Sequence, residues 1–245
     1  MLIVENLSKS FNKNITLTPW MGTRNVNVIN DISFSINQGD RLAILGHNGS
    51  GKTTLLKSLF GSIQPDSGNI IWKTENKKLE GQLKNISSLL NNNDRSFFWR
   101  LTVRENLKYF NSLNDISVIL EDFEGRYGDL SIIDYLDTPF MSLSSGQKKK
   151  IALFRGLIKN PEIIFFDEFT DSLDINNQIE LKNLIKKELT MNLKKTIIWV
   201  THSIEEVKDI CNKIIVLERG LIIHFDDCFD GSDKKIYRIK SLLTK

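Results

Sequence analysis

The segment Gly46–Thr53 has the residue types and spacing of a phosphate-binding loop. It reads Gly46-His-Asn-Gly-Ser-Gly-Lys-Thr53 and matches the pattern G-x-x-x-x-G-K-[S/T]. Glycines let backbone N–H groups converge on phosphate oxygens, and a helix N-terminus behind them favours negative charge. We expect Lys52 to bridge the β- and γ-phosphates of a nucleotide and Thr53 to bind Mg²⁺. The expected nucleotide contacts are Gly46, His47, Asn48, Gly49, Ser50, Gly51, Lys52, Thr53 and Thr54.

Two carboxylates follow a second apolar run. Ile163-Ile-Phe-Phe166 is a candidate buried strand, and Asp167 and Glu168 come directly after it. The carboxyl end of a strand in an open α/β sheet faces the crevice where ligands bind. We expect Asp167 to hold Mg²⁺ through its water shell and Glu168 to orient or deprotonate an attacking water. The run alone is weak evidence; together with the loop it strongly indicates an ATPase.

A parallel sheet with helices on its faces would bring these two sites together, and the chain predicts one. Short β-rich runs alternate with helical patterns, which is typical of α/β folds. The candidate strands are 41–45, 163–166, 196–200 and 214–217, and the candidate helices are 52–60, 102–111, 175–189 and one running to 211. Thr102–Glu105 and Ser203–Glu206 have the spacing of capping boxes. The middle of the chain, about 73–140, has weaker strand signals and is predicted to include a helical insertion.

Composition narrows the class of protein. The chain has 245 residues, 40% of them hydrophobic and 26% charged, which is ordinary for globular proteins. A net charge of +3 is too balanced for an electrostatic nucleic-acid binder. Cys211 and Cys228 lack the spacing of a disulfide framework or a zinc site. With no apolar run of 18 residues, we expect a soluble, intracellular protein that reaches a membrane only through a partner.

Further motifs make the chain similar to the ATP-binding cassette (ABC) family of transporter ATPases. Leu143-Ser-Ser-Gly-Gln147 precedes the 163–168 run by about 20 residues, as the signature motif of that family does. Asp167–Asp174 matches the D-loop of the family, and His202 stands where the family keeps its switch histidine. Phe11 matches the aromatic residue that stacks on adenine. The resemblance covers nearly the whole chain.

The resemblance implies an α/β P-loop NTPase core, with a mostly parallel sheet and flanking helices. It also implies an N-terminal antiparallel β subdomain and an inserted helical signature subdomain. Residues 1–245 would form a single ABC ATPase domain. The core with its β subdomain would occupy about 1–72 and 160–245, and the Q-loop and helical signature subdomain about 85–159.

The family's site residues carry over onto this chain by motif. The resemblance implies a head-to-tail homodimer with two ATP molecules between the subunits. Signature residues of one subunit would close on the γ-phosphate held by the other, His202 would hydrogen-bond that phosphate, and Asp174 would couple the two sites. The signature residues are Ser144, Ser145, Gly146 and Gln147. Catalysis is assigned to Glu168, His202 and Lys52, with ATP and Mg²⁺ as cofactors.

Three positions depart from the family pattern. The signature has Ser145 where a glycine is usual, and Phe169 stands where the family usually has proline. The Q-loop glutamine is missing, and counting back eight residues from Leu101 puts Asn93 in its place as a third Mg²⁺ ligand. Neither Lys52 nor Glu168 is affected, so we expect an active ATPase.

The stretch Arg95-Ser-Phe-Phe-Trp-Arg-Leu101 points to a partner. In the ABC family this region receives a helix of the membrane subunit, and aromatic residues and Arg are enriched at binding hot spots. The other interpretation is that Phe97, Phe98 and Trp99 pack the helical subdomain. The residues 14–27 are predicted to lengthen the first hairpin, where Trp20 and Met21 could cover the nucleotide or a partner.

The segment 95–110 resembles exporter cassettes that pair with separate polytopic membrane subunits. We therefore expect an ATP-hydrolysing subunit that drives export, cytoplasmic and peripheral on the inner face of the cell membrane. One alternative is a soluble ABC-type ATPase acting on ribosomes or DNA. The single cassette and low net charge disfavour it, so no nucleic acid is expected as partner. The other is an importer subunit, disfavoured because only about 25 residues follow the last predicted strand.

Overall fold

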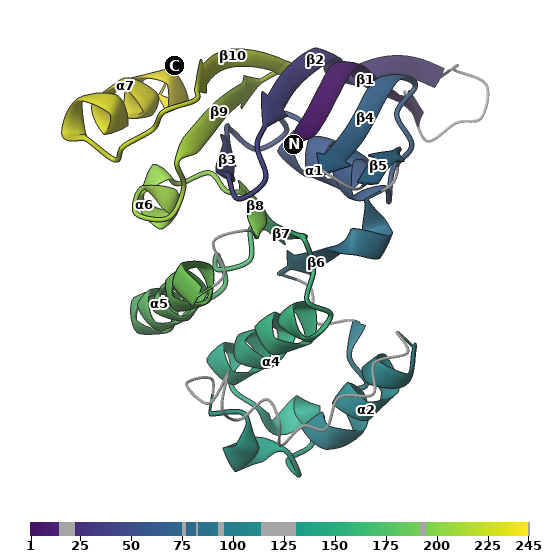
Figure 1. Cartoon of the computed structure of the whole chain (residues 1–245), viewed down its shortest axis with the longest axis vertical. Helices are drawn as coiled ribbons and strands as arrows, with labels where there is room; N and C mark the ends of the chain where they lie inside the picture. Colours follow the sequence, from purple (N-terminus) through teal and green to yellow (C-terminus); the bar gives the residue numbers. More distant parts are fainter. Residues whose placement is uncertain are drawn as a thin grey trace.

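The computed structural model describes residues 1–14, 23–74, 77–81, 83–92, 96–113, 131–191 and 195–244. An antiparallel sheet with the strand order β2-β1-β4-β5 occupies the top right of Figure 1. Its strands are β1 (Leu2–Asn14), β2 (Thr23–Ile36), β4 (Ser67–Thr74) and β5 (Lys77–Glu80). The β1–β2 pairing continues out to Asn14 and Thr23, so the predicted lengthening of the first hairpin is confirmed. Trp20 and Met21 lie outside the described residues.

The second sheet has the strand order β10-β9-β3-β8-β7-β6 and is parallel except for β10. Its strands are β3 (Arg41–Leu45), β6 (Ser87–Asn91), β7 (Ile163–Asp167), β8 (Thr196–Val200), β9 (Lys213–Glu218) and β10 (Leu221–Asp226). The continuous apolar runs at β7 and β8 are buried along their whole length, as expected for strands covered on both faces. All four predicted strands are confirmed, whereas the two edge strands, β6 and β10, were not predicted.

Helices cover both faces of the parallel sheet. They are α1 (Lys52–Phe60), α2 (Val103–Leu113), α4 (Ser145–Ile158), α5 (Ile175–Met191), α6 (Ile204–Val207) and α7 (Asp233–Leu243). In Figure 1, α1 lies between the two sheets, and α4 and α2 form the end of the molecule farthest from β1 and β2. Two hydrophobic cores result: Ile44 belongs to the one that contains α1, and its neighbours Ala43 and Leu45 to the one that contains α4. None of the described helices is long and apolar enough to cross a membrane.

The helix predicted after Ser203 begins where expected, but it is shorter than predicted and its capping box does not form. The helix expected to open at Ser203 and run to 211 is only the four residues of α6, and Ser203 makes no side-chain capping bond. The carboxylate of Glu206, which would complete a capping box, instead accepts a hydrogen bond from Thr170 Oγ1 inside the protein. The capping box at Thr102 and Glu105 does form, because Thr102 N donates to Glu105 and Glu105 N donates to Thr102 Oγ1.

Candidate functional site

The glycine-rich loop connects β3 to α1, the context in which it binds phosphate. Gly46 has a φ of 154°, and a Cβ there would lie 2.2 Å from the carbonyl oxygen of Leu217. Gly51, with a φ of 105°, would place a Cβ 2.6 Å from the carbonyl oxygen of Val28. Both positions therefore need glycine, which lets the loop pass close to the backbones of β9 and β2.

Lys52 is buried at the start of α1, and its ammonium lies across the loop. Nζ donates to the carbonyl oxygens of Gly46 at 2.8 Å and His47 at 2.9 Å. Burial lowers the pKa of Lys52, while the nearby carboxylates Glu168, Asp167 and Asp171 act in the other direction. His47, Asn48 and Gly49 are exposed, and Thr54 is half-buried in the first turn of α1. Ser50 is buried, and its hydroxyl has no hydrogen-bond partner among the described residues.

Thr53 meets the end of β7. Its Oγ1 donates to Asp167 Oδ1 at 3.1 Å, so the first turn of α1 and the carboxyl end of β7 converge, as predicted. Burial raises the pKa of Asp167, while the hydrogen bond from Thr53 lowers it. A hydroxyl and a carboxylate oxygen at this distance form a donor set that suits Mg²⁺. Asn93 lies outside the described residues; β6, which leads towards it, ends at Asn91 beside Asp167.

Glu168 and His202 come from the ends of adjacent strands. Glu168 has a φ of 48°, a left-handed conformation that is uncommon for a side chain of this kind, and its N–H donates to the carbonyl of Val200 at 3.0 Å. His202 follows β8, and its side chain is 59% exposed. One donor atom each of Glu168, Asp171 and His202 lies within 4.8 Å of the others. Neither Asp171 nor Glu206 was singled out from the sequence.

The signature residues begin α4. Ser144 and Gln147 form a capping box: Ser144 Oγ accepts from Gln147 N at 3.2 Å, and Gln147 Oε1 accepts from Ser144 N at 2.9 Å. A Cβ on Gly146 would lie 2.3 Å from the Asn177 side chain, so α4 and α5 meet closely there. Hydrogen bonds from Asn177 lower the pKa of Asp174. Ser145 is exposed in the first turn of α4, so these residues form a second group, built on the N-termini of two helices.

The remaining predicted residues have simple surroundings. Phe11 lies on β1 opposite Val26, is 38% exposed, and has the ammonium of Lys9 5.4 Å from its ring centre. Phe169, in place of the usual proline, is fully buried against Phe166 with the ammonium of Lys149 4.8 Å from its ring centre. At this position a packing contact therefore replaces the rigidity of a proline.

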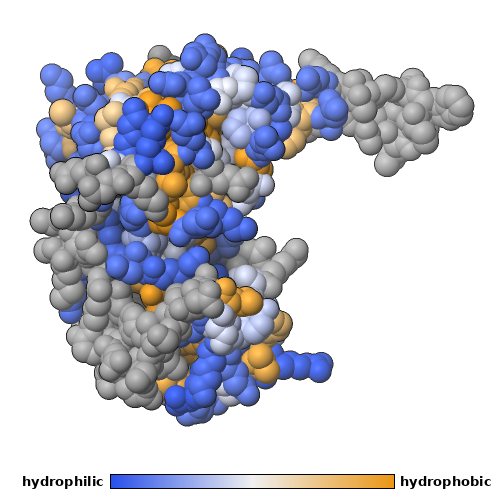
Figure 2. Space-filling model, turned by 45° about the vertical axis from the view of Figure 1, so that its right-hand side comes forward, coloured by the Kyte–Doolittle hydropathy of each residue, from blue (hydrophilic) through white to orange (hydrophobic). Residues whose placement is uncertain are grey.

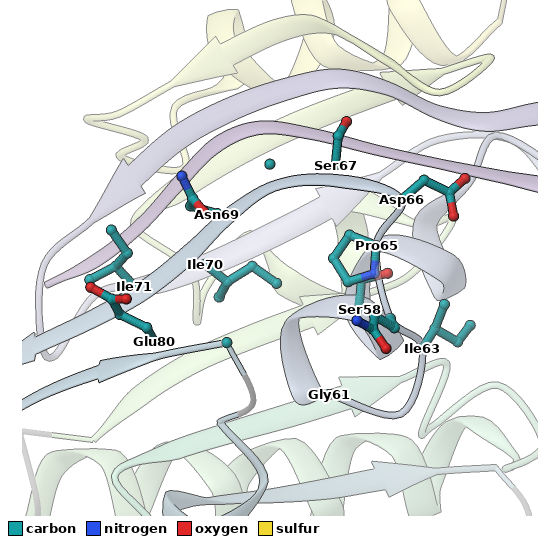
Figure 3. A pocket seen from close by; sticks show the side chains of 13 residues that line it. Ser58, Gly61, Ile63, Pro65, Asp66, Ser67, Asn69, Ile70, Ile71 and Glu80 are labelled. Carbon is teal, nitrogen blue, oxygen red and sulfur yellow. The ribbon is translucent and has the colours of Figure 1, made fainter.

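A cavity of about 440 Å³ lies at the other end of α1. It is lined by Ser58 and Gly61 from the end of that helix, by Pro65, and by residues of β4 and β5 that include Asn69 and Glu80 (Figure 3). Because the phosphate-binding loop precedes the start of α1 and this cavity surrounds its end, the cavity is not part of the nucleotide site.

The fold and this site define a P-loop nucleotide-binding protein of the cassette type. The sequence profile of the family described as "ABC transporter" matches residues 29–171. The chain is 32% identical over 205 residues to the ABC transporter ATP-binding protein NatA of Bacillus subtilis, covering 81% of each chain. It is 31% identical to the methionine import ATP-binding protein MetN 1 of Enterococcus faecalis, covering 88% of this chain and 62% of that protein.

A solved structure agrees. CbiO1 from Clostridium perfringens, described as part of the ABC transporter complex cbiONQ, superposes with a TM-score of 0.73. It is 26% identical, with 98% of this chain and 92% of that one covered. The chain therefore belongs to the ABC transporter family, as an ATP-binding cassette subunit, and the expected fold class is confirmed.

Proposed function

We propose that this chain hydrolyses ATP as the nucleotide-binding subunit of an ABC transporter. The observation that carries the proposal is the 3.1 Å hydrogen bond from Thr53 to Asp167, because it joins the phosphate loop to the end of β7. Lys52 would bind the β- and γ-phosphates, and Thr53 and Asp167 would hold Mg²⁺, with Asn93 as the proposed third ligand. When bound, Mg²⁺ draws charge from the phosphate oxygens.

Glu168 is the proposed general base. It takes a proton from a water molecule while the water oxygen bonds to the γ-phosphorus. The bond from that phosphorus to the bridging oxygen then breaks, and its electron pair leaves with ADP. His202 would hydrogen-bond the γ-phosphate, and Phe11, exposed on β1, would stack on adenine.

The second group of residues is the proposed dimer contact. Ser144, Ser145, Gly146 and Gln147 begin a helix of 14 residues whose N-terminus favours a phosphate. In a head-to-tail homodimer this end would close on ATP held by the partner subunit, and Asp174 would link the two sites. We keep the division of the single domain into a core at about 1–72 and 160–245 and a signature subdomain at about 85–159 as part of this proposal.

The surface near α2 supports docking of a membrane subunit. Phe97 is buried and stacks on Phe140, but Phe98 and Trp99 are 45% and 49% exposed. Buried Asn106 holds their loop in place by accepting from Phe98 N at 2.8 Å and donating to Phe98 O at 3.0 Å. Rigid, exposed aromatic side chains are typical of binding hot spots. Figure 2 shows the molecule hollowed between its upper and lower parts, with hydrophobic residues exposed there.

A cavity of about 210 Å³ in the same region adds a charge preference. It lies beside the edge strand β6 and is lined by Phe60, Phe110 and the basic residues Lys84, Arg155 and Lys159. Its apolar and basic lining favours a partner segment with apolar and acidic side chains. We propose that the chain acts at the cytoplasmic face of a membrane through a polytopic subunit docked here.

The proposal leaves the direction of transport to that membrane subunit. Export was expected from the resemblance of segment 95–110 to exporter cassettes. MetN 1, however, is named as an importer and aligns over most of this chain, so export is not retained as part of the proposed function. The cassette supplies the same ATP-driven closure in both cases.

Two measurements test the proposal. Purified protein should release phosphate from MgATP, and Lys52→Ala should not; an inactive wild type refutes the ATPase. Affinity capture from detergent-solubilised native membranes should recover a stoichiometric polytopic protein. Trp99→Ala should reduce that recovery, while Tyr237→Ala, which alters an even more exposed aromatic on α7, should not. Recovery of only ribosomal or DNA-bound proteins would favour the soluble ATPase instead.

A further inference from the structure

Asp171 lies beside two residues of the proposed catalytic group. Its Oδ2 is 3.5 Å from Nδ1 of His202, and its backbone N–H donates to the carbonyl of Glu168. The side chain of Asp171 is 19% exposed, against 59% for His202. Asp171 has no role in the phosphate and Mg²⁺ binding proposed above, although its carboxylate faces the imidazole of His202.

A buried polar pair lies behind Asp171. Glu206 is 8% exposed, and its Oε1 accepts a hydrogen bond at 3.0 Å from the fully buried Thr170. Oε2 of Glu206 and Oδ1 of Asp171 are both buried and have no hydrogen-bond donor among the described residues. The two carboxyl groups lie close enough to share a proton, and this hydrogen bond from Glu206 helps to raise the pKa of Asp171. Burying a carboxylate oxygen without a donor lowers the stability of the fold. Because the protein keeps two such oxygens here, we infer that this position of the D-loop serves a function.

We propose that Asp171 is a positioning residue for His202: its carboxylate accepts the Nδ1–H of the imidazole and so directs Nε2 to the γ-phosphate. The proposal rests on the proposed ATPase function. Packing constrains an exposed ring little, so a hydrogen bond at one nitrogen is an effective way to orient it. The 3.5 Å separation is long for a hydrogen bond, and catalytic hydrogen bonds often tighten only when substrate binds.

This arrangement fixes what each ring nitrogen does. In the neutral ring Nδ1 carries the hydrogen, because its neighbour is an anionic acceptor. With the γ-phosphate in place, the ring lies between two anions. A ring that has bound a second proton there donates to both, from Nε2 to phosphate and from Nδ1 to Asp171, and the carboxylate offsets its charge.

The same contacts make the positioning sensitive to pH. The groups that face Asp171 are Glu206 from α6, His202 after β8, Glu168 at the end of β7 and Lys52 on α1. Burial first, and then the charge of Glu206, raises the pKa of Asp171 to about 6, while His202 acts in the opposite direction. Below that pH, Asp171 binds a proton, loses its negative charge and becomes a weaker acceptor for the Nδ1–H.

The first test measures which nitrogen of the His202 ring carries the hydrogen. Long-range ¹H–¹⁵N spectra of histidine-labelled protein at pH 7.5 should show His202 protonated at Nδ1. In Asp171→Ala the hydrogen should move to Nε2. Addition of ADP and orthovanadate should protonate both nitrogens in the wild type. An unchanged tautomer in Asp171→Ala, in a protein whose other amide signals are unperturbed, would overturn the proposal.

The second test measures the rate of ATP hydrolysis and its dependence on pH. Asp171→Asn should lower kcat about tenfold with KM for ATP within twofold, and should flatten the acidic limb of the pH profile near 6. Glu206→Gln, which keeps the acceptor for Thr170, should move that limb to lower pH. Asp209→Asn removes an exposed carboxylate just beyond α6 and should match the wild type.

The two tests separate the proposals. If the wild type releases no phosphate, the ATPase function fails, and the tautomer measurement still decides whether Asp171 holds His202. If the wild type is active and Asp171→Asn keeps its kcat and pH profile, the ATPase function stands and the positioning role is refuted.

Discussion

Two carboxylates at the carboxyl end of β7 differ in their hydrogen bonding: Asp167 ends the strand, and Asp171 lies in the loop that follows it. Asp167 accepts a hydrogen bond from Thr53, a residue of the phosphate loop. Asp171 turns one oxygen to His202, and its other, buried oxygen has no donor among the described residues besides a protonated Glu206. Burial raises the pKa of both acids, for Asp171 to about 6, while the hydrogen bond from Thr53 acts against the rise at Asp167.

The difference separates two kinds of site. The Thr53–Asp167 contact joins two sequence motifs, so it holds the loop ready for phosphate. The Asp171 group gathers side chains from the D-loop, the segment after β8 and α6, and it keeps polar oxygens unpaired. Such unpaired groups reduce stability and are typical of places where protonation or orientation matters. The predictions below probe this contrast, starting with the largest expected effect.

Glu168→Gln should separate binding from chemistry. Glutamine keeps the size of the side chain but cannot accept the proton of water, so turnover should fall about 10²–10⁴-fold. ATP binding should persist, because the phosphate loop is unchanged, and size-exclusion chromatography should show an ATP-dependent dimer. Unchanged phosphate release would refute the assignment of the base.

Thr170→Val should remove a buried hydrogen bond near Asp171 without changing the phosphate-binding loop. Valine has the shape of threonine and lacks its hydroxyl, so Glu206 loses the hydrogen bond that Thr170 donates within a buried site. We expect a loss of about 2 kcal/mol in the free energy of unfolding, measured by urea denaturation. Thr170→Ser, which retains the hydroxyl, is the control and should lose less than half as much.

Phe11→Ala tests the far rim of the nucleotide site. If the exposed ring stacks on adenine, its loss should weaken ATP binding by about 1 kcal/mol, or about fivefold in Kd by titration calorimetry. Phe11→Tyr keeps the aromatic face and should bind as the wild type does. Equal affinity of Phe11→Ala and wild type would make Phe11 a residue of the hairpin alone.

The phosphate side could be predicted from sequence because its parts are short and contiguous. The loop before Lys52, the buried run before Asp167 and the capping box at Ser144 each show in a few adjacent residues. Their convergence follows from a general rule for parallel sheets, that strand ends meet at one edge. The structure then supplies the distance between Thr53 and Asp167, which no local pattern contains.

The Asp171 side could not be predicted in the same way. Ser203 to Glu206 has the spacing of a capping box, and local rules favour Glu206 turning back to its own helix. Glu206 instead accepts the long-range hydrogen bond from Thr170, and α6 is only four residues long. The residues 170 and 206 are far apart in the chain, so only the tertiary fold brings out this contact. The edge strand β10 was missed for a similar reason, since it is half-exposed and pairs on one side only.

Asp171→Asn should make the protein slightly more stable at neutral pH. This is the smallest expected effect, and it distinguishes Asp171 from Asp167 most directly. The folded-state pKa of Asp171 is about 6, above the ordinary value of 3.8, so the folded protein binds the proton more tightly than the unfolded chain. Stability therefore falls as pH rises from about 4 to about 6, and the full cost is present above that window.

Asparagine stays neutral and avoids this cost. The gain should be about 1 kcal/mol, well below the full value of the shift because the side chain keeps contact with water. It should appear as a rise in Tm of about 2–4 °C at pH 7.5 that disappears at pH 4, with Asp209→Asn as the control that shows no rise. A variant that is both more stable and less active would show that the buried charge of Asp171 positions His202 at a cost in stability. A loss of stability at pH 7.5 would instead mean that the ionised carboxylate stabilises the fold.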